Sequence, residues 1–377
     1  MSISRRHLFE RLAGAAAVAV APRSARAGHA EAVDPAVDTA SHIIRLHRNE
    51  SAYGASPKAL ASIHRAAASA VRYPDRAADD LRARLAAFHR VTPDEIVLGC
   101  GSSEVMQMAV DACVGPRKRL VTATPTFPWP AEAARRGGGD VVALPLTREY
   151  AHDLDAMRGA VGDAGGLIYI CNPNNPTGTL TRRPDVEAFV RALPPATYVL
   201  VDEAYHHYVR ESSGYRSFID DRIDDPRVIV VRTFSKAYGL AGLRIGYAVA
   251  APETARALAA QRLADGVNAV AAHAAIAALD DGEHLRASIQ RNADDRQEFY
   301  NQANARMLKG IDSHANFAMM NTGERALDVV ERLGSLGVLV PAPFPRFDNY
   351  VRISLGNAFD MRAFWRAWDR AAGNMMM

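Results

Sequence analysis

The 377-residue chain is 49% hydrophobic and 23% charged, which is the composition of a soluble globular protein with a large core and excludes a disordered chain. Its 45 lysines and arginines against 42 acidic residues leave a net charge of +3 at pH 7, so nothing in the charge indicates nucleic-acid binding. The three cysteines, Cys100, Cys113 and Cys171, show no CxxC pair and no zinc-type spacing with histidine. This excludes a disulfide framework and predicts no metal site.

Residues 1–27 have the layout of an export signal. Arg5 and Arg6 precede a weakly apolar run over residues 12–21, and a small-residue cleavage pattern follows at Ala25–Ala27. The apolar run is too short for a stable membrane anchor, and the paired arginines resemble a twin-arginine signal. We therefore expect the mature chain to be periplasmic or secreted. The alternative is an ordinary disordered terminus rich in alanine and arginine.

The next elements predict an N-terminal arm and helix over residues 28–71 and then a large α/β domain over residues 72–255. Ser56 and Pro57 supply an N-cap and a first-turn proline for the helix. Short apolar runs rich in Val, Ile and Leu then alternate with helical stretches, which predicts a mainly parallel, seven-stranded sheet covered on both faces. The expected strands are Ile96–Leu98, Leu120–Ala123, Val141–Leu144, Leu167–Cys171, Tyr198–Val201, Val228–Arg232 and Arg244–Val249.

Residues 256–377 have a different pattern, mostly helical, with short strands expected around Ala315–Met320 and Tyr350–Ser354. This predicts a smaller C-terminal domain of the α+β type. The chain shows no internal repeat and no low-complexity tract.

Four polar clusters follow predicted strands, where ligands of parallel sheets gather. They are Gly99–Glu104, which opens a helix expected at Val105–Val114, and then Asn172–Gly178, Asp202–Tyr205 and Thr233–Gly246. Each alone has a plainer interpretation: a helix cap, a Pro/Gly turn, a satisfied structural aspartate, a surface lysine. Together, in this order, they supply what pyridoxal phosphate (PLP) needs: a lysine for a Schiff base, a carboxylate for the pyridine nitrogen, and donors for a phosphate.

These motifs resemble those of the class I and II aminotransferases of the PLP fold type I superfamily, and within it those of the histidinol-phosphate aminotransferases. The likeness runs from about Ile43 to Trp368. Its most specific parts are Asn172–Gly178 and the sequence from Ser235 to Gly246, in which Arg244 follows Lys236 by eight positions. The resemblance implies the PLP-transferase fold type I and a PLP-dependent transaminase.

The resemblance also implies roles for individual residues. Lys236 would be the Schiff-base lysine and proton shuttle, Asp202 would pair with the pyridine nitrogen, and Tyr205 would complete the catalytic set. The cofactor-binding residues implied are Ser102, Ser103, Phe127, Asn175, Asp202, Tyr205, Ser235, Lys236, Arg244 and Tyr73. Tyr73 would reach the phosphate of a neighbouring subunit, which implies a homodimer with shared active sites.

Arg352 would grip the substrate carboxylate, with Asn316 and Tyr53 as further substrate-binding residues. The chain departs from the family's pattern nearby. Pro341 stands where the phosphate-substrate enzymes usually carry an arginine, and proline offers no donor. Arg346 follows five positions later. We therefore expect histidinol phosphate to be a poor substrate and an ordinary amino acid, aromatic or otherwise apolar, to be the donor.

We expect an aminotransferase that acts on an amino acid and a 2-oxo acid. The alternatives are another PLP reaction on the same scaffold (a decarboxylase, racemase or amino-acid oxidase), a regulator that kept the pocket, and a solute-binding protein. Enzymes that catalyse another PLP reaction share every cofactor residue with a transaminase, so only their products distinguish the two.

Overall fold

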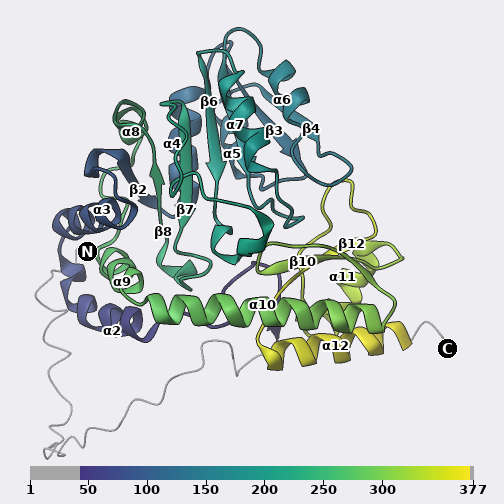
Figure 1. Cartoon of the computed structure of the whole chain (residues 1–377). Helices are drawn as coiled ribbons and strands as arrows, with labels where there is room; N and C mark the ends of the chain where they lie inside the picture. Colours follow the sequence, from purple (N-terminus) through teal and green to yellow (C-terminus); the bar gives the residue numbers. More distant parts are fainter. Residues whose placement is uncertain (1–42, 374–377) are drawn as a thin grey trace, which may run out of the picture. The chain divides into compact units, whose positions relative to one another are not determined.

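The computed structural model describes residues 43–373 (Figure 1). The predicted export signal lies outside these residues. Within them, no helix is long and apolar enough to cross a bilayer. The first helix, α2 (Pro57–Ala66), begins where the sequence predicts, because the Ser56 hydroxyl accepts a hydrogen bond from the Ala59 amide at 3.1 Å.

A seven-stranded sheet forms the centre of the large domain, with strand order β2-β8-β7-β6-β5-β3-β4. Its pairs are parallel except for those of β8, which runs antiparallel to both of its neighbours. The prediction of a mainly parallel sheet, with all seven strands, is confirmed. The strands are β2 (Ile96–Cys100), β3 (Arg119–Thr124), β4 (Val141–Pro145), β5 (Gly166–Cys171), β6 (Thr197–Asp202), β7 (Val228–Thr233) and β8 (Ile245–Val249).

Helices cover both faces of this sheet, so its strands are apolar on both sides. Along β5, Ile168 and Ile170 face one core and Leu167, Tyr169 and Cys171 face the other. The first core is completed by α3 (Asp75–His89), α6 (Leu154–Val161), α7 (Arg183–Arg191) and α9 (Ala269–Leu279). The second is completed by α4 (Ser102–Cys113), α5 (Trp129–Arg136) and α8 (Pro252–Ala259).

The smaller domain has a three-stranded antiparallel sheet of order β12-β10-β9. A separate two-stranded parallel pair joins β1 of the arm to β11. Figure 1 shows the long helix α10 running beside α12. The elements are β1 (Ile44–Arg45), α10 (Gly282–Ala305), β9 (Lys309–Ile311), β10 (Phe317–Asn321), α11 (Ala326–Ser335), β11 (Val338–Leu339), β12 (Tyr350–Ser354) and α12 (Ala358–Gly373).

The packing crosses two of the predicted domain boundaries. Helix α9 packs on α2 and α3 and contributes to the core of the large sheet, although it lies beyond residue 255. Its burial explains this, because an alanine-rich helix that is apolar all round needs neighbours on every side. In the other direction, Leu46 of the arm belongs to the core of the smaller domain.

Short 3₁₀ helices complete the described chain at Ala67–Val71, Pro93–Glu95, His206–Tyr208, Glu211–Ser213 and Ala241–Leu243. Helix α4 begins at Ser102, three residues before the predicted start at Val105. The earlier start follows from Gly101, whose φ of 76° turns the chain sharply after β2.

Candidate active site

A cavity of about 820 Å³ lies at the carboxyl ends of β5, β6 and β7. Its walls also include residues 47–50 of the arm and residues 341–344 of the smaller domain. Ten of the predicted site residues line it: Ser102, Ser103, Phe127, Asn175, Asp202, Tyr205, Ser235, Lys236, Arg244 and Arg352. They meet here because parallel strands deliver their following loops to one edge of the sheet.

Lys236 projects into this cavity from the loop after β7. Its Nζ donates hydrogen bonds to the carbonyl oxygens of Arg48 at 3.0 Å and Asn49 at 2.9 Å. Burial, together with the charge of Arg352, lowers the pKa of Lys236 to about 7. A large share of Lys236 is therefore a neutral amine near neutral pH, which is the form that attacks a carbonyl carbon.

Asp202 ends β6 and is 3% exposed. Its Oδ2 accepts a hydrogen bond from the Tyr169 hydroxyl at 2.8 Å, and its Oδ1 accepts one from the Ala204 amide at 3.0 Å. Burial raises the pKa of Asp202 to about 6, although both donors and Lys236 act in the opposite direction. The carboxylate is thus held in place by two donors and lines the cavity.

A cradle for a phosphate forms where the start of α4 meets Arg244. The Arg244 guanidinium donates to the Ser235 hydroxyl at 3.3 Å and to the Ala241 carbonyl at 3.1 Å. A Cβ on Gly101 would lie 2.2 Å from Arg244 Nη2, and one on Gly246 would lie 2.4 Å from the Ser102 amide nitrogen. Only glycine permits this close approach, which aims backbone amides, hydroxyls and a guanidinium at one place.

The substrate side of the cavity is organised around Arg352 on β12. Its Nη1 donates to Asn175 Oδ1 at 2.6 Å and its Nη2 to the His47 carbonyl at 2.7 Å. The guanidinium lies between the rings of Phe317 and Phe344, at 5.4 and 5.1 Å from their centroids. Burial lowers the pKa of Arg352 to about 10, so the group remains a cation at neutral pH.

Three predicted site residues do not line this cavity. Asn316 donates from Nδ2 to the Asn49 and Glu50 carbonyls, each at 3.1 Å, and so it holds the arm. The Tyr53 hydroxyl is turned away and donates to Asp295 of α10. Neither is a wall residue of the cavity. Tyr73 is 78% exposed, and its predicted reach to a partner's phosphate stays a prediction.

Asn49 is a site residue that the sequence reasoning missed. It is 1% exposed, lines the cavity, and donates from Nδ2 to the Tyr205 hydroxyl at 3.1 Å. Its own Oδ1 accepts from the Ser354 hydroxyl at 2.9 Å, and its carbonyl accepts from Lys236. The sequence carries a signal in the adjacent polar residues Asn49 and Glu50 of the arm.

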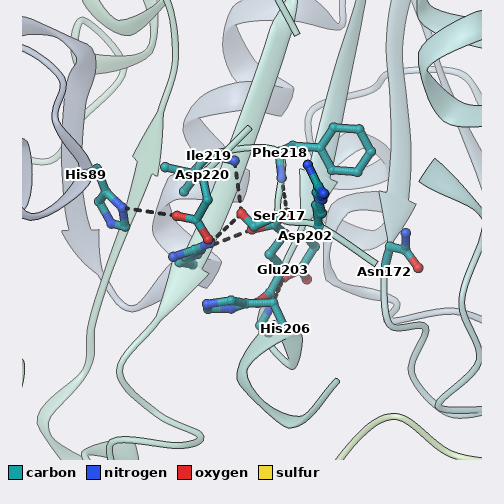
Figure 2. A network of polar contacts seen from close by, with 12 residues as sticks. His89, Asn172, Asp202, Glu203, His206, Ser217, Phe218, Ile219 and Asp220 are labelled. Atoms are coloured by element: carbon teal, nitrogen blue, oxygen red, sulfur yellow. Dashed lines mark hydrogen bonds and ion pairs between the residues drawn. The ribbon is translucent and has the colours of Figure 1, made fainter. Parts of the chain in front are cut away.

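A buried network of charged and polar side chains lies next to Asp202 (Figure 2). Glu203, the neighbour of Asp202, is fully buried and pairs with Arg232 Nε at 3.0 Å. Its two oxygens also accept from the Tyr215 and Ser217 hydroxyls and from the Phe218 amide, at 2.9, 2.7 and 2.7 Å. The network ties the loop after the His206–Tyr208 turn to the end of β6.

Comparisons with known proteins show the family and the fold. The family described as aminotransferase class I and II matches residues 41–367. A histidinol-phosphate aminotransferase of Moorella thermoacetica is 35% identical over 86% of this chain and 84% of its own length. An aromatic amino acid aminotransferase of Nocardia farcinica is 37% identical over 86% of this chain and 90% of its own length.

The crystal structure of histidinol-phosphate aminotransferase from Sinorhizobium meliloti in complex with pyridoxal-5'-phosphate has the same fold. It superimposes with a TM-score of 0.82 at 32% identity, and the match covers 88% of this chain and 92% of that one.

The chain therefore belongs to the class I and II aminotransferase family, and its fold is the PLP-transferase fold type I. It is a PLP-dependent aminotransferase that moves an amino group from an amino acid to a 2-oxo acid.

The residues present fit the cofactor: an amine in Lys236, a carboxylate in Asp202, an aromatic wall in Phe127 and a cradle at Gly101 and Arg244. When bound, PLP supplies a carbonyl carbon that condenses with amino groups and a ring that accepts electrons from the substrate Cα.

The chain's own residues supply the rest of the chemistry. With the cofactor bound, the amine of Lys236 would be placed to take the proton from the substrate Cα and to release it again. Asp202 would hold the ring nitrogen and favour its protonated form, in which the ring is a better electron acceptor. Among residues 43–373 no group of three His, Cys, Asp or Glu side chains is placed to hold a metal ion.

Proposed function

We propose that the amino donor is an α-amino acid with an apolar side chain, aromatic ones first, and that histidinol phosphate is a poor substrate. The observation that supports this proposal best is the position of Arg352 beside an apolar wall of the cavity. Arg352 is a buried cation with a fork of donors that matches a carboxylate. An α-amino acid has such a carboxylate and histidinol phosphate does not.

The wall formed by Pro341, Ala342, Pro343 and Phe344 provides no positive charge and no side-chain donor. It lies beside the Arg352 guanidinium, because the ring of Phe344 is 5.1 Å away. Arg346, the one replacement that the sequence suggested for an arginine at position 341, is exposed and is not a wall residue. An apolar side chain therefore fits this wall better than a phosphate does.

The relatives leave both substrates open, since histidinol-phosphate and aromatic amino acid aminotransferases match at similar identity. One positively charged residue, Arg48, favours histidinol phosphate as the substrate. Its side chain is exposed and lines the cavity, and its backbone carbonyl accepts a hydrogen bond from Lys236. The test must therefore examine Arg48 as well as Pro341.

The experiment compares kcat/KM for histidinol phosphate with a panel of amino acids, using 2-oxoglutarate and pyruvate as acceptors. We expect phenylalanine, tyrosine or another apolar amino acid to exceed histidinol phosphate at least tenfold. Pro341→Arg should raise kcat/KM for histidinol phosphate about 10- to 150-fold, since a charge-assisted contact contributes about 1.5–3 kcal/mol. Pro343→Arg is the matched control. The proposal would be refuted if kcat/KM were tenfold higher for histidinol phosphate than for every amino acid and if this preference were lost in Arg48→Ala.

We further propose that the enzyme is exported and is a homodimer with shared active sites. Support for export is the Arg5–Arg6 pair before a weak apolar run. Arg5→Lys combined with Arg6→Lys should retain the precursor in the cytoplasm, because the export receptor reads arginines and not charge alone. Unchanged delivery of the double variant to the periplasm would count against this route.

A further inference from the structure

Tyr169 is a fully buried phenol in β5 that lines no part of the cavity. It lies in the core beneath α4 and α5, among apolar side chains. A buried hydroxyl is costly unless it makes a hydrogen bond. The Tyr169 hydroxyl donates to Asp202 Oδ2 at 2.8 Å, so this phenol is directed at a carboxylate that lines the cavity.

The sheet register explains how Tyr169 reaches Asp202. Strands β5 and β6 are parallel, with Cys171 opposite Asp202 and Tyr169 opposite Leu200. Side chains two residues apart on a strand share a face, so the long Tyr169 ring lies below Cys171 and extends to the end of the neighbouring strand. Asp202 is therefore contacted by Tyr169 from the core side and is open to the cavity on the other.

We propose that Tyr169 is a positioning residue for transamination: its hydroxyl orients the Asp202 carboxylate towards the cofactor's ring nitrogen and keeps that carboxylate ionised. Tyr169 itself lines no part of the cavity, and the hydrogen bond of its hydroxyl to Asp202 connects it to the site. The same hydroxyl also interacts with the Cys171 thiol, which lines the cavity.

The groups around Asp202 show why such a donor matters. Burial and the charge of Glu203 raise the pKa of Asp202, whereas Tyr169, the Ala204 amide and Lys236 lower it. The Cys171 thiol and the Tyr205 phenol, which also face Asp202, are themselves disfavoured from ionising beside it. Tyr169 is thus the one side-chain hydroxyl that donates to this carboxylate among the described residues.

The test is Tyr169→Phe, which removes a single oxygen atom. The matched control is Tyr198→Phe on β6, a partly buried tyrosine of the same core that makes no contact with Asp202. The first readout is the affinity of the cofactor-free protein for PLP at pH 6 and pH 8. Loss of the hydroxyl should raise the pKa of Asp202 by about one unit. Affinity should therefore fall about fivefold at pH 6 and less than twofold at pH 8.

The second readout separates positioning from a general loosening of the fold. Tyr169→Phe should lower kcat several-fold while KM for the amino acid stays within about twofold. In an Asp202→Asn background the same change should have no further pH-dependent effect, because its target is gone. An equal loss of affinity at both pH values, no loss at pH 6, an effect as large in the Asp202→Asn background, or the same behaviour in Tyr198→Phe would each overturn the proposal.

Discussion

Burial favours the neutral forms of both Lys236 and Asp202 in the site. The pKa of Lys236 is lowered to about 7 and that of Asp202 is raised to about 6. A cofactor that brings a carbonyl carbon and a ring nitrogen relieves both conditions at once. The free site is therefore electrostatically prepared for its ligand, at a cost in stability that the ligand recovers.

The first prediction concerns the pH dependence of cofactor capture by Lys236. Because its folded pKa lies below the ordinary 10.5, the neutral amine is favoured in the fold and is lost only as pH falls through about 7. The rate of covalent PLP capture by the cofactor-free protein should rise with pH through a midpoint at about 7 and level off above about pH 8. Arg352→Met removes a nearby charge and should move the midpoint upward; an unchanged midpoint would contradict the assignment.

At the next scale, the loop Asn172–Gly178 is held by His152 and Thr181. The Cys171 amide donates to His152 Nε2 at 3.3 Å, so Nδ1 carries the proton and donates to the Thr181 hydroxyl at 2.9 Å. Asn172 makes two more bonds to Thr181, at 2.9 and 3.0 Å. A neutral histidine therefore anchors the loop that presents Asn175 to the cavity.

The second prediction is that His152 makes the fold sensitive to acid. Burial lowers the pKa of His152 from 6.5 to about 4, so its contribution is fully present above pH 6.5 and is lost as pH falls from there towards 4. His152→Gln should reduce the slope of unfolding free energy against pH over this range by about 1.4 kcal/mol per pH unit. Urea unfolding at several pH values measures this; parallel curves for wild type and variant would refute it.

The third prediction concerns the Glu203–Arg232 network (Figure 2). Arg232→Leu leaves a fully buried carboxylate without its cation, which should cost about 3–5 kcal/mol of unfolding free energy. Arg158→Leu, which breaks the exposed ion pair with Asp155 on α6, should cost much less. Urea unfolding of both variants decides the matter. Equal effects would mean that the network does not stabilise the fold more than a surface pair.

The fourth prediction belongs to the whole molecule. Val71, Tyr73 and Leu263 are 83%, 78% and 70% exposed. Residues 70–74 and 268–270 also line a depression of about 430 Å³. Large exposed apolar side chains of this kind indicate a partner surface, and the proposed homodimer supplies one. Val71→Asp with Leu263→Asp should shift sedimentation from dimer to monomer and weaken PLP affinity. Phe359→Asp, at an exposed position on α12, is the control. A wild-type monomer would refute the proposed dimer.

The sequence predicted most of the large domain because its signals are local. Strands buried on both faces are continuous apolar runs, and the residues after them meet at one edge of the sheet, which is why Lys236, Asp202 and Arg244 were found. Whether Asn49, Asn316 and Tyr53 line the cavity depends on where the arm lies against β12 and α10. That placement comes from long-range contacts, such as the one between Asn49 and Ser354, which no local pattern shows.

The most direct test of the account is a single-turnover measurement on the PLP-loaded enzyme with phenylalanine and no acceptor. We predict one equivalent of 2-oxo acid per site, no carbon dioxide and no racemised substrate, and a reaction that then stops until a 2-oxo acid is added. Lys236→Ala should release almost none. Continued turnover without an acceptor, or release of carbon dioxide, would contradict the account and indicate oxidase or decarboxylase chemistry on the same residues.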